Sequence, residues 1–121
     1  MSKEELSKKK CVPCEGGVPA LTKKDAKNFL KDLKMWKLSK KGKSVRAEYV
    51  MRDFASAVEL ISCIAAIAEA EDHHPDLHLT GYRKLAVELS THAIGGLSEN
   101  DFILAAKIEA LPKQLKESAV L

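Results

Sequence analysis

The sequence predicts an α+β fold: a four-stranded antiparallel sheet with three helices packed on one face, in the order α-β-β-α-β-β-α. Two pairs of short runs alternate apolar and polar residues, and a polar turn joins each pair, as is typical of β-hairpins. Segments with apolar residues at helical spacing precede, separate and follow the two pairs. Hairpins that alternate with helices favour an antiparallel sheet covered on one side.

A length of 121 residues suits one domain with a single core. We expect this domain to span residues 21–112, because the periodic segments lie within that range. Residues 1–20 are rich in lysine and end in "CEGGVPA", which predicts an irregular basic arm that carries a CxxC motif. Residues 113–121 would form a short C-terminal tail.

The first helix and hairpin follow directly after the arm. Thr22 and Asp25 have the spacing of a capping box, which predicts a helix over residues 22–34. Residues 35–38 then resemble a short strand, "SKKGKS" a polar turn and residues 45–51 a second strand.

A long helix is predicted over residues 54–71, with Asp53 as its N-cap. We assign its core stripe to Phe54, Ala57, Val58, Ile61, Ile64, Ala65 and Ala68. The second face is also apolar, with Ala55, Leu60, Cys63, Ala66 and Ile67. Because one sheet cannot cover a helix that is apolar nearly all round, the second face is predicted to contact another subunit. The alternative is that helices of the same chain bury it.

Pro75 should end this helix near His73, since the residue before a proline disfavours the helical conformation. "LHLTGY" and "KLAVELST" then predict a second hairpin, whose fourth strand would end at His92. A capping box at "SEND" predicts a last helix that reaches about Ala110, before Pro112.

Charge and hydropathy exclude several classes of protein. Of the 20 Lys and Arg residues, 14 lie in residues 1–46, but only Phe29 and Trp36 are interleaved there as aromatics, so a solvated basic face is favoured over direct nucleic-acid binding. No apolar run approaches the ~20 residues of a membrane span. The N-terminal sequence lacks the apolar segment of a secretory signal, so we expect a cytoplasmic protein with reduced cysteines.

The three cysteines are an odd number, which argues against a disulfide framework. Cys11 and Cys14 have the spacing of zinc and redox motifs, but no second pair of ligands follows them. A structural role is favoured for this CxxC, and a metal or redox role stays open. Cys63 is predicted to be a small core residue.

Three of the four histidines lie in "EAEDHHPDLH", residues 69–78. A metal site is disfavoured, because Pro75 separates His74 from His78 and no known metal-ligand spacing is present. The stretch instead suits proton transfer. His73 and His74 follow a helix C-terminus, where the dipole favours a cation, and carboxylates surround them.

The predicted hairpin brings a further histidine to the same place. The fourth strand returns antiparallel to the third, so its C-terminal end with Ser90, Thr91 and His92 should lie beside the start of the third strand. Two imidazoles that face one pocket can act as general acid and general base. On these features alone, structural histidines remain an alternative.

The motifs resemble those of the pterin-4a-carbinolamine dehydratase family. The family's signature is an acidic residue, His-His-Pro, an aromatic residue, a later His and an Asp at set spacings. It is matched here by Glu69, His73-His74-Pro75, Tyr82, His92 and Asp101. The resemblance covers roughly residues 21–110.

This resemblance implies a hydro-lyase that removes water from 4a-hydroxytetrahydrobiopterin during recycling of the tetrahydropterin, with neither metal nor other cofactor. It implies that His73 and His92 are the acid–base pair and that His74 binds the pterin. Substrate-binding residues would be Asp72, Glu69, Ser90, Thr91 and Trp36. Asp101 is assigned to capping the last helix instead, and His78 is left out of the site.

The resemblance also implies homodimers or homotetramers, formed through the helix 54–71 and the sheet edges. An alternative function is that of a non-catalytic oligomeric interaction or assembly factor on the same fold, similar to a transcriptional cofactor. Retention of all three histidines in register favours the enzyme.

Overall fold

The computed structural model describes residues 1–12 and 19–117. Its sheet contains β1 (Trp36–Leu38), β2 (Val45–Val50), β3 (Asp76–Thr80) and β4 (Lys84–Leu89). The spatial order is β1-β2-β4-β3 and all neighbours are antiparallel. The helices are α1 (Lys3–Lys8), α2 (Lys23–Phe29), α3 (Phe54–Glu71) and α4 (Glu99–Glu109). The predicted α+β fold with a four-stranded antiparallel sheet is therefore confirmed.

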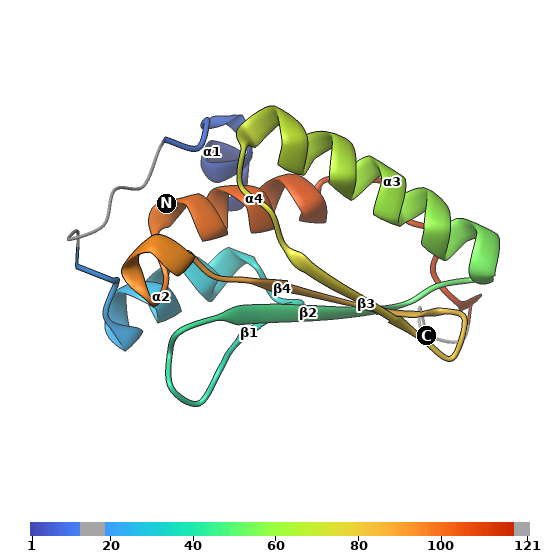
Figure 1. Ribbon diagram of the computed structural model, residues 1–121, viewed down its shortest axis with the longest axis horizontal. Helices are drawn as coiled ribbons and strands as arrows, with labels where there is room; N and C mark the ends of the chain where they lie inside the picture. The colour runs from blue at the N-terminus through green and yellow to red at the C-terminus, as the bar shows by residue number, and fades with distance from the viewer. Residues whose placement is uncertain (13–18, 118–121) are drawn as a thin grey trace.

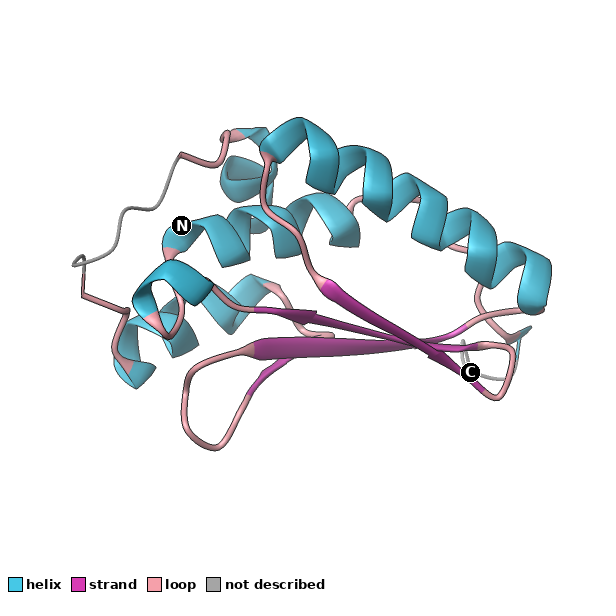
Figure 2. Cartoon of the chain, in the orientation of Figure 1, coloured by secondary structure: helices cyan, strands magenta, loops and turns pink. Residues whose placement is uncertain are grey.

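Helices α3 and α4 lie over one face of the sheet, with α1 beside α4 (Figure 1). Figure 2 shows the sheet as one layer and helices α3 and α4 as a second layer on it. Helix α4 lies at the centre of the core, because the sheet, α1 and α3 surround it. Its buried residues are Asn100, Asp101, Phe102, Ile103, Leu104, Ala105, Ala106 and Ile108. Helix α2 packs on α4 through Phe29 and Phe102, whose rings stack with centroids 4.8 Å apart.

Alternation along the central strands places apolar side chains towards the helices. In β4, Leu85, Val87 and Leu89 are all buried, as the sequence predicts for one face of a strand. After α4, the chain returns to the sheet, where Arg52 N–H donates to Gln114 O (2.7 Å) and Lys116 N–H to Val50 O (2.9 Å). Part of the predicted tail is thus paired with the end of β2. In the part of the chain that is described, no helix has the length and apolar character needed to cross a membrane.

The N-terminal arm differs from the irregular segment that its composition predicts. Residues Lys3–Lys8 form α1, which Ser2 and Glu5 begin with a complete capping box. Leu6 is fully buried against the main core, so one apolar side chain anchors the helix. The lysine-rich composition hides this short helix, because only one of its residues faces the core. Cys14 lies outside the described residues.

The rotation of α3 also differs from the prediction, although the bounds of this helix agree with it. Ala57, Ile64 and Ala68 are buried as expected, whereas Phe54 and Val58 are exposed. Leu60, assigned to the outer face, has only 3% of its surface exposed and belongs to the core. A helix that is apolar nearly all round carries no amphipathic signal strong enough to fix its rotation.

Two element ends differ as well. Helix α2 ends at Phe29 and a short 3-10 helix over Leu30–Asp32 continues it, where a single helix over 22–34 was expected. Strand β4 ends at Leu89, and His92 begins another 3-10 helix, His92–Ile94, rather than ending the strand. Terminal turns of this kind are common, because helix ends tighten and strand ends fray.

Candidate active site

The end of α3 forms one side of the site. Asp72 adopts the left-handed conformation (φ 50°), which aspartate tolerates better than most residues. His73 N–H then donates to Ala68 O at 3.2 Å, which closes the helix end. This left-handed cap lies three residues before Pro75, so the helix ends before the proline is reached. The turn that follows carries His73 and His74.

The segment after β4 forms the opposite side. Asp76 pairs with Glu88, so the residues that follow Leu89 run alongside those that precede Asp76. Thr91 forms an isolated antiparallel bridge with Gly96, and the loop between them contains His92. The topology therefore brings Ser90, Thr91 and His92 close to the histidine turn.

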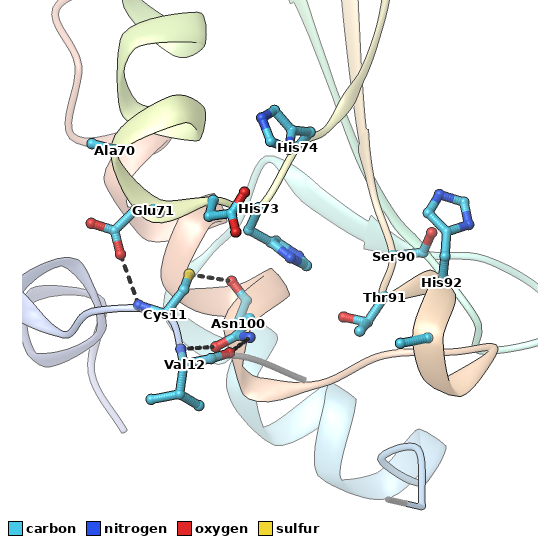
Figure 3. Close-up of a pocket in the computed structure, with 12 residues that line it drawn as sticks. Cys11, Val12, Ala70, Glu71, His73, His74, Ser90, Thr91, His92 and Asn100 are labelled. Carbon is cyan, nitrogen blue, oxygen red and sulfur yellow. Dashed lines mark hydrogen bonds between the residues drawn. The ribbon is translucent and has the colours of Figure 1, made fainter. Parts of the chain in front are cut away.

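A pocket of about 600 Å³ lies between these two segments and the start of α4 (Figure 3). Six of the residues proposed from sequence line it, namely His73, His74, His92, Asp72, Ser90 and Thr91. The remaining lining residues are Cys11, Val12, Ala70, Glu71, Ala93 and Asn100. His73 is largely buried, with 12% of its side chain exposed, whereas His92 is exposed.

Asp101 holds the ring of His73. Its Oδ1 lies 2.6 Å from His73 Nε2, while its Oδ2 accepts from the Thr91 hydroxyl (2.8 Å) and from Ser98 N–H (3.0 Å). The carboxylate is fully buried, and a carboxylate can only accept, so His73 donates from Nε2. Nδ1 is then the ring nitrogen left to exchange a proton with a bound molecule.

The expectation that Asp101 only caps the last helix is therefore incomplete. The contact with Ser98 N–H is the predicted capping contact, and the same carboxylate also orients His73. The family signature already contained Asp101. Its position in a capping box, however, was enough to explain its presence as a residue that begins the last helix. Only the contact across 28 residues shows the second role.

His74 pairs with Glu69, whose Oε2 lies 2.6 Å from His74 Nε2. Both side chains are exposed, so solvent screens the pair and its contribution to stability is small. Glu69 does not line the pocket itself, and its contact with the site is through the His74 ring.

Trp36 is not brought to the pocket, which corrects the expectation that it packs on a bound ring. It lies in β1, at the sheet edge opposite β3, and its side chain is buried in the core. Its position in an alternating strand determines this, since Trp36 pairs with the buried Ala47 on the helix-covered face. His78 lies in β3, is exposed and does not line the pocket, in agreement with its exclusion from the site.

Six lining residues were not proposed as site residues from sequence, and four of them are joined by hydrogen bonds: Cys11 and Val12 of the arm, Glu71 at the end of α3 and Asn100 at the start of α4. Glu71 was expected only as one of the carboxylates near His73 and His74. Sequence spacing offered no signal for the other three as site residues, because they reach the pocket only when the arm folds back over α4. Within residues 1–12 and 19–117, no group of three or more His, Cys, Asp or Glu side chains is arranged to hold a metal ion.

Cys11 is in an environment that disfavours thiolate chemistry. Burial and the neighbouring Glu71 carboxylate raise the pKa of the Cys11 thiol to about 12. Its Sγ also donates a hydrogen bond to Asn100 O, at 3.6 Å. These contacts support the structural interpretation of Cys11, because reactive and metal-binding cysteines require an accessible thiolate.

We expect Cys11 to be alkylated by iodoacetamide at pH 8 at least about 100-fold more slowly than Cys63, because its thiolate fraction is very small. Cys63 was predicted to be a small core residue, but it is exposed on α3. Mass spectrometry of a Cys14→Ser variant would measure both rates, and unfolding in guanidinium chloride should make them similar. Equal rates in the folded protein would restore the redox or metal interpretation.

Comparison with known proteins agrees with the resemblance in the sequence motifs. The family model described as pterin 4 alpha carbinolamine dehydratase matches residues 19–111. A Nitrosomonas eutropha relative named for this dehydratase is 44% identical over 108 residues, which cover 88% of this chain and 93% of the relative. A Rickettsia canadensis relative with the same name is 48% identical, covering 87% and 95%.

Two further similarities extend the comparison. Pterin-4-alpha-carbinolamine dehydratase 2, mitochondrial, of Arabidopsis thaliana is 43% identical and covers 88% of this chain and 59% of that protein. The crystal structure of the transcriptional coactivator/pterin dehydratase from Brucella melitensis has a TM-score of 0.70 at 28% identity, covering 75% of this chain and 96% of that one.

The α+β fold is thus shared with a structure whose name includes pterin dehydratase. The chain belongs to the pterin-4a-carbinolamine dehydratase family, a family of hydro-lyases, as the resemblance in its motifs implied.

Proposed function

We propose that this protein catalyses the loss of water from 4a-hydroxytetrahydrobiopterin, which gives quinonoid dihydrobiopterin in tetrahydrobiopterin recycling. The observation that supports this most strongly is the His73–Asp101 pair, since it supplies an oriented imidazole in the same pocket as a second, exposed imidazole, His92. Family membership supports the pterin carbinolamine as the substrate.

The chemistry needs only proton transfers. The C4a–O bond breaks and the hydroxyl leaves with an added proton as water. N5 loses its proton, and its electron pair forms the new C4a=N5 double bond. One group that donates a proton and one that accepts a proton therefore complete the reaction, and each such group contributes about 10²–10⁴-fold in rate.

His73 and His92 are proposed as this acid–base pair. Asp101 keeps the proton of neutral His73 on Nε2, which leaves Nδ1 for exchange with the substrate. His74 would bind the pterin, with its ring oriented by Glu69. Asp72, Ser90 and Thr91 line the pocket and supply oxygen atoms for the polar edge of the ring.

The direct test is a stopped-flow assay of water loss from chemically generated 4a-hydroxytetrahydrobiopterin. We expect the purified protein to accelerate this step in buffer that contains no added metal or redox cofactor. A rate equal to that of the uncatalysed reaction would refute the proposed activity.

Replacing Asp101 with asparagine should lower kcat by about tenfold or more, because the amide no longer fixes which nitrogen of His73 carries the proton. The same assay measures this effect, and circular dichroism verifies the fold. Asp76→Asn is the matched control, since Asp76 is an exposed carboxylate of β3 outside the pocket. Wild-type kcat in a folded Asp101→Asn protein would contradict the proposed role.

We also propose a homodimer or homotetramer that forms through α3 and the sheet edges. The exposed residues of α3 include Phe54, Ala55, Val58, Ala65 and Ala66, so a helix face that contacts solvent is largely apolar. The edge strands β1 and β3 are the other candidate contacts.

The same surface favours a second candidate function, that of an interaction factor without catalysis. The name of the Brucella melitensis protein includes transcriptional coactivator as well as pterin dehydratase. Pocket variants distinguish the two functions, because they would abolish dehydration and leave an assembly function intact. The cytoplasmic location stays a prediction, and the Arabidopsis relative is named as mitochondrial.

A further inference from the structure

Residues 9–12, the arm segment, contact both elements that carry the His73–Asp101 pair. Cys11 N–H donates to Glu71 Oε1 at 2.7 Å, and Glu71 is the last residue of α3, two positions before His73. Val12 contacts Asn100, which lies in the first turn of α4, directly before Asp101. The arm segment therefore bridges the end of α3 and the start of α4 (Figure 3).

The contact with Asn100 is made by both ends of its side-chain amide. Oδ1 accepts from Val12 N–H at 3.0 Å, and Nδ2 donates to Val12 O at 2.6 Å. Asn100 is only 4% exposed, so these polar atoms depend on the arm for their hydrogen bonds. The amide thus pairs with both the N–H and the C=O of Val12, as a residue of a neighbouring β-strand does.

Contacts outside this bridge hold the arm in place. Leu6 of α1 is buried in the main core, and Lys107 Nζ donates to Ser7 O at 2.8 Å. Lys9 pairs with Glu99 at 2.7 Å. The arm segment is thus attached to α4 before it reaches Glu71, which allows it to restrain the end of α3.

We propose that Asn100 and Glu71 are positioning residues for the proposed dehydration, acting through the backbone of Cys11 and Val12. By linking the end of α3 to the start of α4, they hold His73 Nε2 at 2.6 Å from Asp101 Oδ1. The inference rests on the proposed function for its kinetic consequence only. Neither residue is part of the family signature, and the arm segment precedes the matched region, which begins at residue 19.

Catalysis is sensitive to such a link, because a displacement of about 1 Å in a reacting group can cost on the order of 10²-fold in rate. Loss of one hydrogen bond in the bridge loosens the pair without removing either member. We therefore expect a smaller effect than from replacing His73, and one confined to kcat.

The test compares Glu71→Ala with Glu71→Gln, together with Asn100→Ala. Glutamine retains an oxygen that accepts from Cys11 N–H, whereas alanine does not. Both alanine variants should lower kcat by about tenfold with KM changed less than about twofold, while Glu71→Gln stays within about twofold of the wild type. Glu59→Ala is the matched control, since Glu59 is an exposed carboxylate of α3 that lies outside the pocket.

The ¹⁵N chemical shifts of the His73 ring provide a readout that does not need turnover. In the wild type and in Glu71→Gln, they should report a proton on Nε2 of the neutral ring. In the alanine variants they should move towards a mixture of the two tautomers, because the contact with Asp101 is weakened.

Wild-type kcat and ring shifts in folded Glu71→Ala would overturn the inference, and this pair decides the outcome if Asn100→Ala does not fold. Failure of the proposed function is a distinct result. A wild-type protein without dehydratase activity whose His73 shifts still respond to Glu71→Ala would keep the positioning role and refute the activity.

Discussion

Replacing His73 with alanine is expected to lower kcat for water loss from 4a-hydroxytetrahydrobiopterin by about 10²–10⁴-fold, the usual contribution of one general acid or base. His73 is the pocket imidazole that a buried carboxylate holds in one orientation. Its removal deletes the proton-exchanging nitrogen and leaves Asp101 without one of its three donors. Single-turnover kinetics would separate this loss from any change in substrate binding.

His92→Ala should give a loss of similar size, because the second proton transfer has no other exposed imidazole at that side of the pocket. His78→Ala is the matched control. His78 is the fourth histidine, exposed on β3 and outside the pocket, so kcat should stay within about twofold of the wild type. The acid–base proposal would be wrong if His73→Ala and His92→Ala both behaved like this control.

The largest expected effect on stability is that of Leu60→Glu. Leu60 is 3% exposed in the core between α3 and the rest of the domain. A carboxylate there loses its hydration without gaining a partner, which should cost about 4–5 kcal/mol or more. Because total stability is typically about 5–15 kcal/mol, we expect a largely unfolded or strongly destabilised protein in urea titrations monitored by circular dichroism.

Val58→Glu is the matched substitution on the opposite side of the same helix. Val58 is 42% exposed, so the folded monomer should lose no more than about 1 kcal/mol. If α3 forms the proposed subunit contact, sedimentation should show a smaller assembly for this variant. An unchanged assembly would remove this face of α3 from the interface, and wild-type stability of Leu60→Glu would contradict its place in the core.

Much of the fold could be predicted because its signals are local. Capping residues, alternating strands and Pro75 indicated the order of the elements, and the bounds of α3 agree with the prediction. Helix α1 was missed because a six-residue helix with a single buried leucine has no periodic pattern to detect. The rotation of α3 was wrong because its apolar residues lie on every side, so that only contact with the sheet and α4 selects the buried face.

The candidate site could be predicted in part. The spacing of His73, His74 and His92, together with an antiparallel hairpin, was enough to expect one pocket, and the structure places all three in its lining. Trp36 was predicted to pack on the bound ring, but its side chain is buried in the core. A family resemblance does not show which face of an edge strand a side chain occupies.

The sequence by itself determined the order of the four strands and of α2, α3 and α4, the family, and the three histidines of the pocket, because each depends on neighbouring residues or on fixed spacing. Only the tertiary structure decided what holds His73. Asp101 contacts His73 across 28 residues of sequence. Glu71 contacts Cys11 across 60 residues, and Asn100 contacts Val12 across 88. Such contacts depend on how α1, α3 and α4 pack around one core, and no local pattern encodes that arrangement.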